Sequence, residues 1–95
     1  MKRFDWNEVK NAFLKTERDI SFEEVQAAIE EGQALADVDH PLKKKYPNQK
    51  VFIVKYGDYV YVVPYIEDDE KIFLKTIYPS RKMAKKYLGK GRKQR

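Results

Sequence analysis

The chain has 95 residues, of which 42% are hydrophobic and 37% are charged, and its formal net charge is +5. This length suits one domain around one core, and the hydrophobic fraction is too high for a disordered chain. The absence of cysteine excludes disulfides, thiolate metal ligands and a cysteine nucleophile, and it fits a reducing cytoplasm. The longest apolar stretch, residues 59–66, is far shorter than the roughly 20 residues that cross a membrane. The basic N-terminus is not followed by an apolar run, so we expect a cytoplasmic protein with no signal peptide and no membrane partner.

The positive charge is concentrated at the C-terminal end. Residues 80–95 contain no acidic side chain but eight basic ones, namely Arg81, Lys82, Lys85, Lys86, Lys90, Arg92, Lys93 and Arg95. The rest of the chain holds 12 basic and 15 acidic side chains, so it is slightly negative. A cluster of this kind can contact several phosphates and release their counterions, which points to a polyanion such as RNA. An acidic protein partner would use the same charges, and that alternative stays open.

Two helices are predicted in the N-terminal third, after a short strand at residues 2–4. Asp5 is the expected N-cap of the first helix, with Glu8 completing a capping box, and the helix runs to about Glu17. Spacings of three and four residues predict that its buried face holds Trp6, Val9, Ala12 and Phe13.

The second predicted helix begins at Ser21, with Glu24 as its capping-box partner. Gly32 is the expected left-handed residue just past its end. The buried stripe of this helix is expected to contain Phe22, Val25, Ala28 and Ile29.

A short strand is predicted within residues 34–38, followed by turns at His40-Pro41 and Tyr46-Pro47-Asn48. His40 is the only histidine. A single histidine before proline in a loop is typical of a structural or solvated side chain, and it cannot form a histidine-rich metal site.

Three strands follow, at residues 50–56, 59–66 and 71–78. Their β-branched and aromatic composition and their short connections predict an antiparallel meander. Pro64 cannot donate to a strand ladder, so we place it at a bulge or at a frayed end of its strand.

The second of these strands has two different faces. Alternation places the tyrosines and Val63 on one face and the residues Val60, Val62, Pro64 and Ile66 on the other. We expect the aliphatic face to pack under the two N-terminal helices. The tyrosine face is then left for the last helix, a partner or a ligand.

Ser80 is the expected N-cap of a final helix over about residues 81–88. Gly89 and Gly91 are expected to end it and to begin a flexible basic tail. The predicted organisation is therefore one domain over residues 1–88 and a tail over residues 89–95.

The junction between the third strand and the last helix is the best candidate for chemistry. RNA supplies its own nucleophile, the 2′-hydroxyl, so an enzyme needs only to orient it and to stabilise the developing phosphate charge, with no metal or other cofactor. The residues expected to take part in catalysis are Arg81, Lys82, Lys75 and Tyr78. The residues expected to bind RNA are Ser80, Lys85, Lys86 and Tyr61.

Three segments give the chain a resemblance to the BrnT toxins of the RelE-like superfamily. They are Phe4-Asp5-Trp6-Asn7, Ile20-Ser21-Phe22-Glu23-Glu24-Val25 and Ile77-Tyr78-Pro79-Ser80-Arg81-Lys82-Met83-Ala84. The resemblance implies a RelE-like α+β fold, with two N-terminal helices packed on an antiparallel sheet of three to four strands and a C-terminal helix. It also implies the toxin of a type II toxin–antitoxin system, a ribonuclease that inhibits translation, on or off the ribosome. The implied partners are RNA, a cognate antitoxin, and operator DNA only through that antitoxin.

Within this resemblance, the family's serine–arginine motif falls on Ser80 and Arg81, and its aromatic-acidic motif falls on Trp6 and Asp5. Two alternatives stay open beside the ribonuclease. One is a non-catalytic RNA-binding or ribosome-associated module, and the other is a basic domain that docks an acidic protein.

Overall fold

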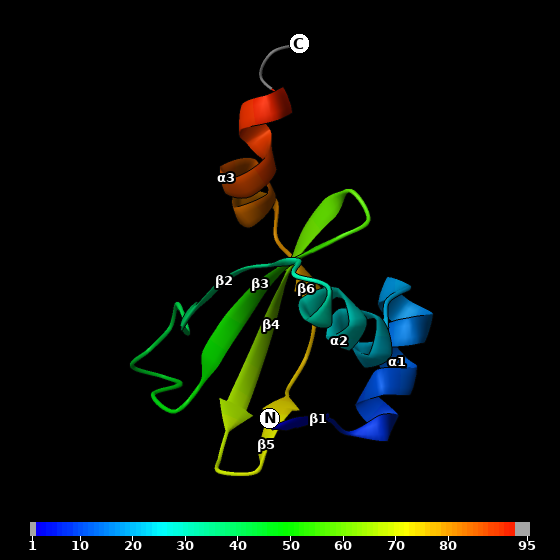
Figure 1. Cartoon of the computed structure of the whole chain (residues 1–95), viewed down its shortest axis with the longest axis vertical. Coiled ribbons are helices and arrows are strands. Elements are labelled where there is room, and N and C mark those ends of the chain that lie inside the picture. The colour runs from blue at the N-terminus through cyan, green and yellow to red at the C-terminus, as the bar shows by residue number, and fades with distance from the viewer. Residues whose placement is uncertain (1, 93–95) are drawn as a thin grey trace.

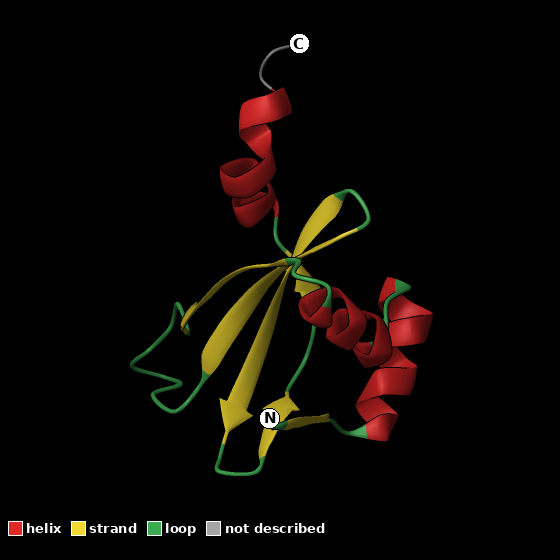
Figure 2. Cartoon of the chain, viewed as in Figure 1, coloured by secondary structure: helices red, strands yellow, loops and turns green. Residues whose placement is uncertain are grey.

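The computed structural model describes residues 2–92, with side chains through Gly89, and has an α+β fold of three helices and a six-stranded mixed sheet (Figures 1 and 2). In chain order the elements are β1 (Arg3–Asp5), α1 (Glu8–Arg18), α2 (Phe22–Glu30), β2 (Ala34–Asp39), β3 (Lys50–Tyr56), β4 (Tyr59–Glu67), β5 (Lys71–Leu74), β6 (Tyr78–Pro79) and α3 (Arg81–Arg92). The predicted α+β class is confirmed, as are the strands beginning at Ala34, Lys50 and Tyr59. No helix within residues 2–92 is long and apolar enough to cross a membrane.

The sheet has the strand order β1-β5-β4-β3-β2, and β6 pairs with β4 beyond the end of β5. Neighbouring strands are antiparallel except for β1 and β5, which run parallel with Phe4 opposite Ile72. The expected antiparallel sheet of three to four strands is therefore wrong in strand number and in this one pair. The β1–β5 pair joins segments almost 70 residues apart, and no local pattern signals such a pair.

The two faces of β4 alternate as predicted, but they pack against the opposite helices. Val63 and Tyr65 share a core with buried residues of α1 and α2, whereas Val60 and Val62 pack against α3. The expectation that the aliphatic face lies under the N-terminal helices is wrong.

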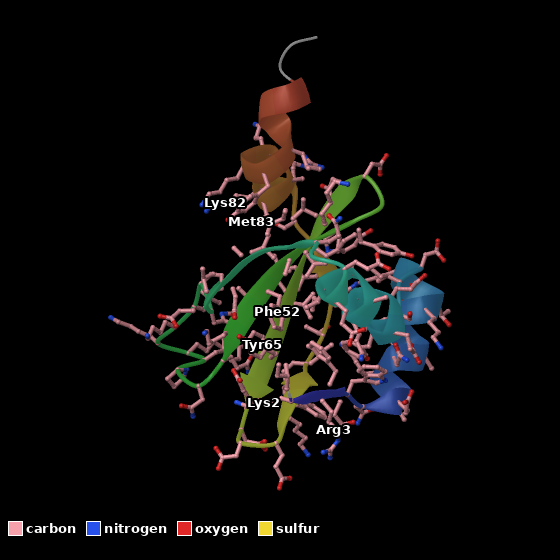
Figure 3. The ribbon with its side chains drawn as sticks, in the orientation of Figure 1. Lys2, Arg3, Phe52, Tyr65, Lys82 and Met83 are labelled. Atoms are coloured by element: carbon pink, nitrogen blue, oxygen red, sulfur yellow. The ribbon has the colours of Figure 1, made fainter. Side chains whose placement is uncertain are left out.

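Tyr65 can lie in the main core because its ring and its hydroxyl both have a partner there. Its ring stacks on that of Phe52 at a centroid distance of 4.3 Å (Figure 3), and its hydroxyl donates to Oδ1 of Asp37 on β2. A buried tyrosine is stable where the hydroxyl has such a partner.

Helix α1 begins later than predicted and presents a different face to the core. Asn7 is its N-cap, and its Oδ1 accepts the amide of Lys10 at 3.0 Å. Asp5 instead belongs to β1, where it pairs with Phe73. The prediction of Asp5 as N-cap is wrong because Asp5 is part of the β1–β5 strand pair, so the helix begins later.

The buried residues of α1 are Asn11 and Leu14. Val9 and Phe13, which the spacing predicts to lie in the core, are 81% and 48% exposed, and Ala12 is also exposed. Trp6 precedes the helix and stacks on Phe22, at a centroid distance of 5.5 Å.

A buried amide fixes this rotation of α1. Oδ1 of Asn11 accepts the backbone N–H of Phe22 at 2.8 Å, and its Nδ2 donates to Glu23 at 2.8 Å. The two bonds join α1 to the first turn of α2 and satisfy a polar side chain that is almost fully buried.

Helix α2 forms as predicted. The Ser21 side chain accepts the N–H of Glu24, and the Glu24 carboxylate accepts the N–H of Ser21, so both halves of the capping box are present. Gly32 has a φ of +88°, the left-handed value that ends a helix. Phe22, Val25 and Ala28 are buried and Ile29 is half-buried.

The third predicted strand is interrupted, which explains the place of Pro64. Residues 75–77 separate β5 from β6. The carbonyl oxygen of Pro64 accepts the N–H of Lys75 at 2.8 Å, and the N and O of one strand residue point to the same side. The side on which Pro64 lacks a donor therefore faces the interruption. Pro64 lies in the middle of β4, buried, rather than at a bulge or a frayed end.

Helix α3 begins as predicted but continues further. Ser80 Oγ accepts the N–H of Met83 at 3.1 Å, which confirms the N-cap. The helix passes Gly89 and reaches Arg92, so the predicted end at Leu88 is wrong. Residues 93–95 of the predicted tail lie outside the described residues.

Candidate nucleic-acid interface

Helix α3 is divided into an apolar side and a basic side. Its apolar side packs on a second hydrophobic cluster, formed by buried residues of β3 and β4. The contributions from α3 are Met83, Ala84, Tyr87 and Leu88, and the buried residues of the sheet are Val51, Ile53, Val60 and Val62. The packing fixes the rotation of the helix and so decides which side faces solvent.

We call the opposite side the basic face of α3, defined as Arg81, Lys82, Lys85 and Lys86. All four residues are exposed. At 3.6 residues per turn, positions spaced by one, four and five residues gather on one side of a helix. Figure 3 shows Lys82 beside Met83 at the beginning of the helix.

The cations of this face are not neutralised by carboxylates. The ion pairs among residues 2–89 involve Lys2, Lys43, Lys50 and Lys71. Residues 80–95 also contain no acidic side chain. The face therefore presents four like charges to solvent, and their mutual repulsion favours an anionic partner.

The start of α3 is anchored to the sheet. The N–H of Ser80 donates to the carbonyl of Val60 at 3.1 Å, and Tyr78 pairs with Val62 in the β4–β6 ladder. Burial raises the pKa of Tyr78, which is half-buried, so its phenol is protonated at neutral pH. Tyr78 can donate a hydrogen bond or contact a base, but it is not a ready proton acceptor.

Lys75 lies with α1 rather than with α3. Its ammonium is 5.5 Å from the ring centroid of Phe73, and both residues line a depression beside α1. The structure therefore does not bring Lys75 to the basic face of α3.

Tyr61 is also separated from the basic face of α3. It is half-buried on the side of β4 that packs against α1 and α2, with its ring edge-on to Tyr56 and Tyr59. Its pKa is raised, first by burial and then by the carboxylates of Asp19 and Asp58. Negative surroundings of this kind disfavour a phosphate.

Arg18 supports the site from a distance, and the sequence pattern did not indicate this role. Its Nη1 donates to the carbonyl oxygen of Ile77, a fully buried residue in the interruption between β5 and β6. The bond ties the end of α1 to the segment that leads into Tyr78 and α3. A contact across 59 residues of sequence has no local signal.

His40 has a structural environment, in agreement with the prediction. Its Nδ1 accepts the N–H of Leu42 at 3.0 Å, and its ring lies 4.6 Å from that of Tyr46. Within the described part of the chain, no group of three or more histidine, aspartate or glutamate side chains is placed to hold a metal ion.

The chain matches no protein-family model, no curated protein and no solved structure in comparisons with all three.

Proposed function

We propose that this protein binds RNA through the basic face of α3 and cleaves it without a metal, as the toxin of a type II toxin–antitoxin system in the cytoplasm. The observation that carries the proposal is the set of four exposed, unneutralised cations on one side of α3. The resemblance to BrnT toxins adds the RelE-like assignment, the cognate antitoxin and the indirect link to operator DNA.

In the proposed reaction, the 2′-oxygen of RNA attacks the adjacent phosphorus, and the bond from phosphorus to the 5′-oxygen breaks. The products are a 2′,3′-cyclic phosphate and a 5′-hydroxyl. The 2′-hydroxyl loses its proton to water, and the 5′-oxygen gains one from Lys82 or from water. Arg81, at the positive end of the helix dipole, stabilises the extra charge on the phosphate as the bonds exchange.

Tyr78 is proposed to position the base next to the cleaved bond, because its raised pKa keeps it neutral and its ring is half-buried. Lys75 and Tyr61 are omitted from the proposed site, because they lie away from the basic face of α3.

A second candidate is RNA binding without cleavage. It is favoured because the start of α3 offers no ready proton acceptor. The phenol of Tyr78 has a raised pKa, and Lys75, which was expected to assist, lies away from the basic face of α3. Charge alone gives affinity, whereas cleavage also needs a proton acceptor, supplied here by water.

The test is incubation of an end-labelled mRNA with purified protein in EDTA, with and without ribosomes. We expect cleavage by the wild type and a loss of about a hundredfold or more in Arg81→Ala, as for removal of one group that stabilises a developing oxyanion. The matched control is Lys15→Ala, which removes one exposed charge from α1 and should cleave within about twofold of the wild type.

Intact RNA with salt-dependent binding would reject the ribonuclease and select the second candidate. Intact RNA with no salt-dependent binding would reject both. Induced expression gives a parallel result in cells, because the wild type should slow growth and Arg81→Ala should not.

A further inference from the structure

A depression beside α1 contains side chains that the proposed function does not use. Its volume is about 640 Å³, and it is open to solvent. Its lining residues are Asn7, Val9, Lys10, Phe13, Phe73 and Lys75. We call this feature the α1 groove.

The apolar floor of the α1 groove is exposed because of how α1 is rotated. Val9 and Phe13 lie four residues apart, so they share one side of the helix. At about 100° per residue, each lies about 160° around the axis from Asn11, whose bonds to α2 hold it in the core. The same amide that fixes the helix therefore turns two large apolar side chains, 81% and 48% exposed, toward solvent.

The rim of the α1 groove is positively charged. The ammonium of Lys10 lies 5.2 Å from the ring centroid of Phe13, and that of Lys75 lies 5.5 Å from that of Phe73. None of the lining residues is acidic. A partner that covers this surface must bury apolar groups between two cations.

The strands beside the α1 groove limit the shape of that partner. Phe73 of β5 pairs with Asp5 of β1 on one side and with Ile66 of β4 on the other. Because β5 has no free edge at this point, a partner cannot add a strand to it there. Binding to β5 at this point must come through side chains, as when an amphipathic helix lies in a groove.

We propose that the α1 groove binds an acidic amphipathic helix of a partner protein. The apolar side chains of that helix pack on Val9, Phe13 and Phe73, and its carboxylates pair with Lys10 and Lys75. The basic rim selects an acidic partner over a basic one. This inference concerns a surface separate from the basic face of α3 and does not depend on the proposed function.

The test uses two synthetic helical peptides that share one leucine face and carry either glutamate or lysine on the other. Binding to the full-length, ¹⁵N-labelled protein is followed by amide chemical shifts and by calorimetry. We expect the glutamate peptide to bind at least about tenfold more tightly, with shifts centred on Val9, Phe13 and Phe73.

Three variants distinguish binding in the groove from non-specific hydrophobic binding. Val9→Ser/Phe13→Ser should weaken binding of the glutamate peptide at least about tenfold. The control is Val38→Ser on β2, at a residue as exposed as Phe13 at 48%, and it should change that affinity less than about twofold. Lys10→Glu/Lys75→Glu alters exposed or half-exposed side chains only and should reverse the preference toward the lysine peptide.

Four results would overturn the proposal. They are equal binding of both peptides, no binding of the glutamate peptide up to millimolar concentration, self-association that the Val9→Ser/Phe13→Ser variant abolishes, and shifts in the groove caused by an oligouridylate. The third would assign the groove to a second copy of this chain, and the fourth would assign it to RNA.

Discussion

Asn11 holds α1 against α2 by accepting the backbone N–H of Phe22 on Oδ1, at 2.8 Å. The residue is 1% exposed, and its Nδ2 donates to Glu23. Together with the buried Leu14, this side chain sets which side of α1 faces the core and which side is left for the α1 groove.

Asn11→Ala should lower the free energy of unfolding by about 1–3 kcal/mol, because the N–H of Phe22 would be buried without a partner. Urea denaturation followed by circular dichroism measures the change. The control is Asn48→Ala, at an exposed position in the turn before β3, which should stay within about 0.5 kcal/mol of the wild type. Equal effects in the two variants would contradict the assigned role.

The contact between Tyr56 and Glu24 predicts a pH-dependent stability. Tyr56 Oη donates to Glu24 Oε2 at 2.6 Å. This bond is the main cause of a lowered pKa for Glu24, and also the main cause of a raised pKa for Tyr56. The lowered carboxyl pKa stabilises the fold above the unfolded value of 4.5, and this stabilisation disappears as the pH falls through the folded value. The raised phenol pKa stabilises the fold below 10.0, and this stabilisation disappears as the pH rises through the folded value.

Tyr56→Phe should therefore lower the free energy of unfolding by about 1 kcal/mol near pH 7. The difference from the wild type should narrow below about pH 4.5 and above about pH 10. Denaturation curves at pH 3, 7 and 10.5 check this pattern. A difference that stays constant over the whole range would show that the hydrogen bond is not its cause.

The Arg18–Ile77 hydrogen bond predicts local protection of the segment before α3. In Arg18→Gln, the carbonyl of Ile77 loses a charged donor, and segment 75–80 should open more readily. Hydrogen exchange measured by mass spectrometry should speed up in that segment by about tenfold, the equivalent of about 1.4 kcal/mol. The first turn of α2, where Asn11 and Ser21 accept the N–H groups of Phe22 and Glu24, is the internal reference. Uniform acceleration throughout the protein would instead indicate global destabilisation.

Local chemistry made several elements predictable. The Ser21–Glu24 capping box, the stop at Gly32 and the alternating strands β3 and β4 are encoded by residues close together in sequence. The Ser80 cap and the basic side of α3 follow from spacing in the same way. These features need no knowledge of the rest of the fold.

The errors came from contacts between distant segments. The spacing of Trp6, Val9 and Phe13 indicated one buried helical face. Trp6 does pack on the core, from a position before the helix. Asn11, which accepts the N–H of Phe22, turns Val9 and Phe13 outward. The tyrosine face of β4 was expected to be left for the last helix, a partner or a ligand, but it packs with α1 and α2, and the hydroxyl of Tyr65 donates to Asp37 on β2. A polar atom can be buried when a distant partner satisfies it, and sequence spacing does not reveal that partner.

The predicted site was divided for a similar reason. Arg81, Lys82, Ser80 and Tyr78 stay together because they are consecutive or nearly so around the start of α3. Lys75 is separated from them by the interruption after β5, which lies opposite Pro64 on the neighbouring strand.

The most direct measurement for the proposed RNA interface is fluorescence anisotropy with a labelled single-stranded RNA over a series of salt concentrations. Two variants lose four positive charges each. In the first, the residues replaced by glutamine are those of the basic face of α3. In the second, the residues replaced by glutamine are Lys15, Lys43, Lys44 and Lys45, which are exposed on α1 and in the turn after β2.

We predict that the first variant loses most of its affinity and that its slope of log affinity against log salt falls by about 0.7 for each phosphate that the protein no longer binds. The second variant should keep most of the affinity and the slope of the wild type. If both variants weaken equally, or if the second weakens more, the basic face of α3 is not the RNA interface.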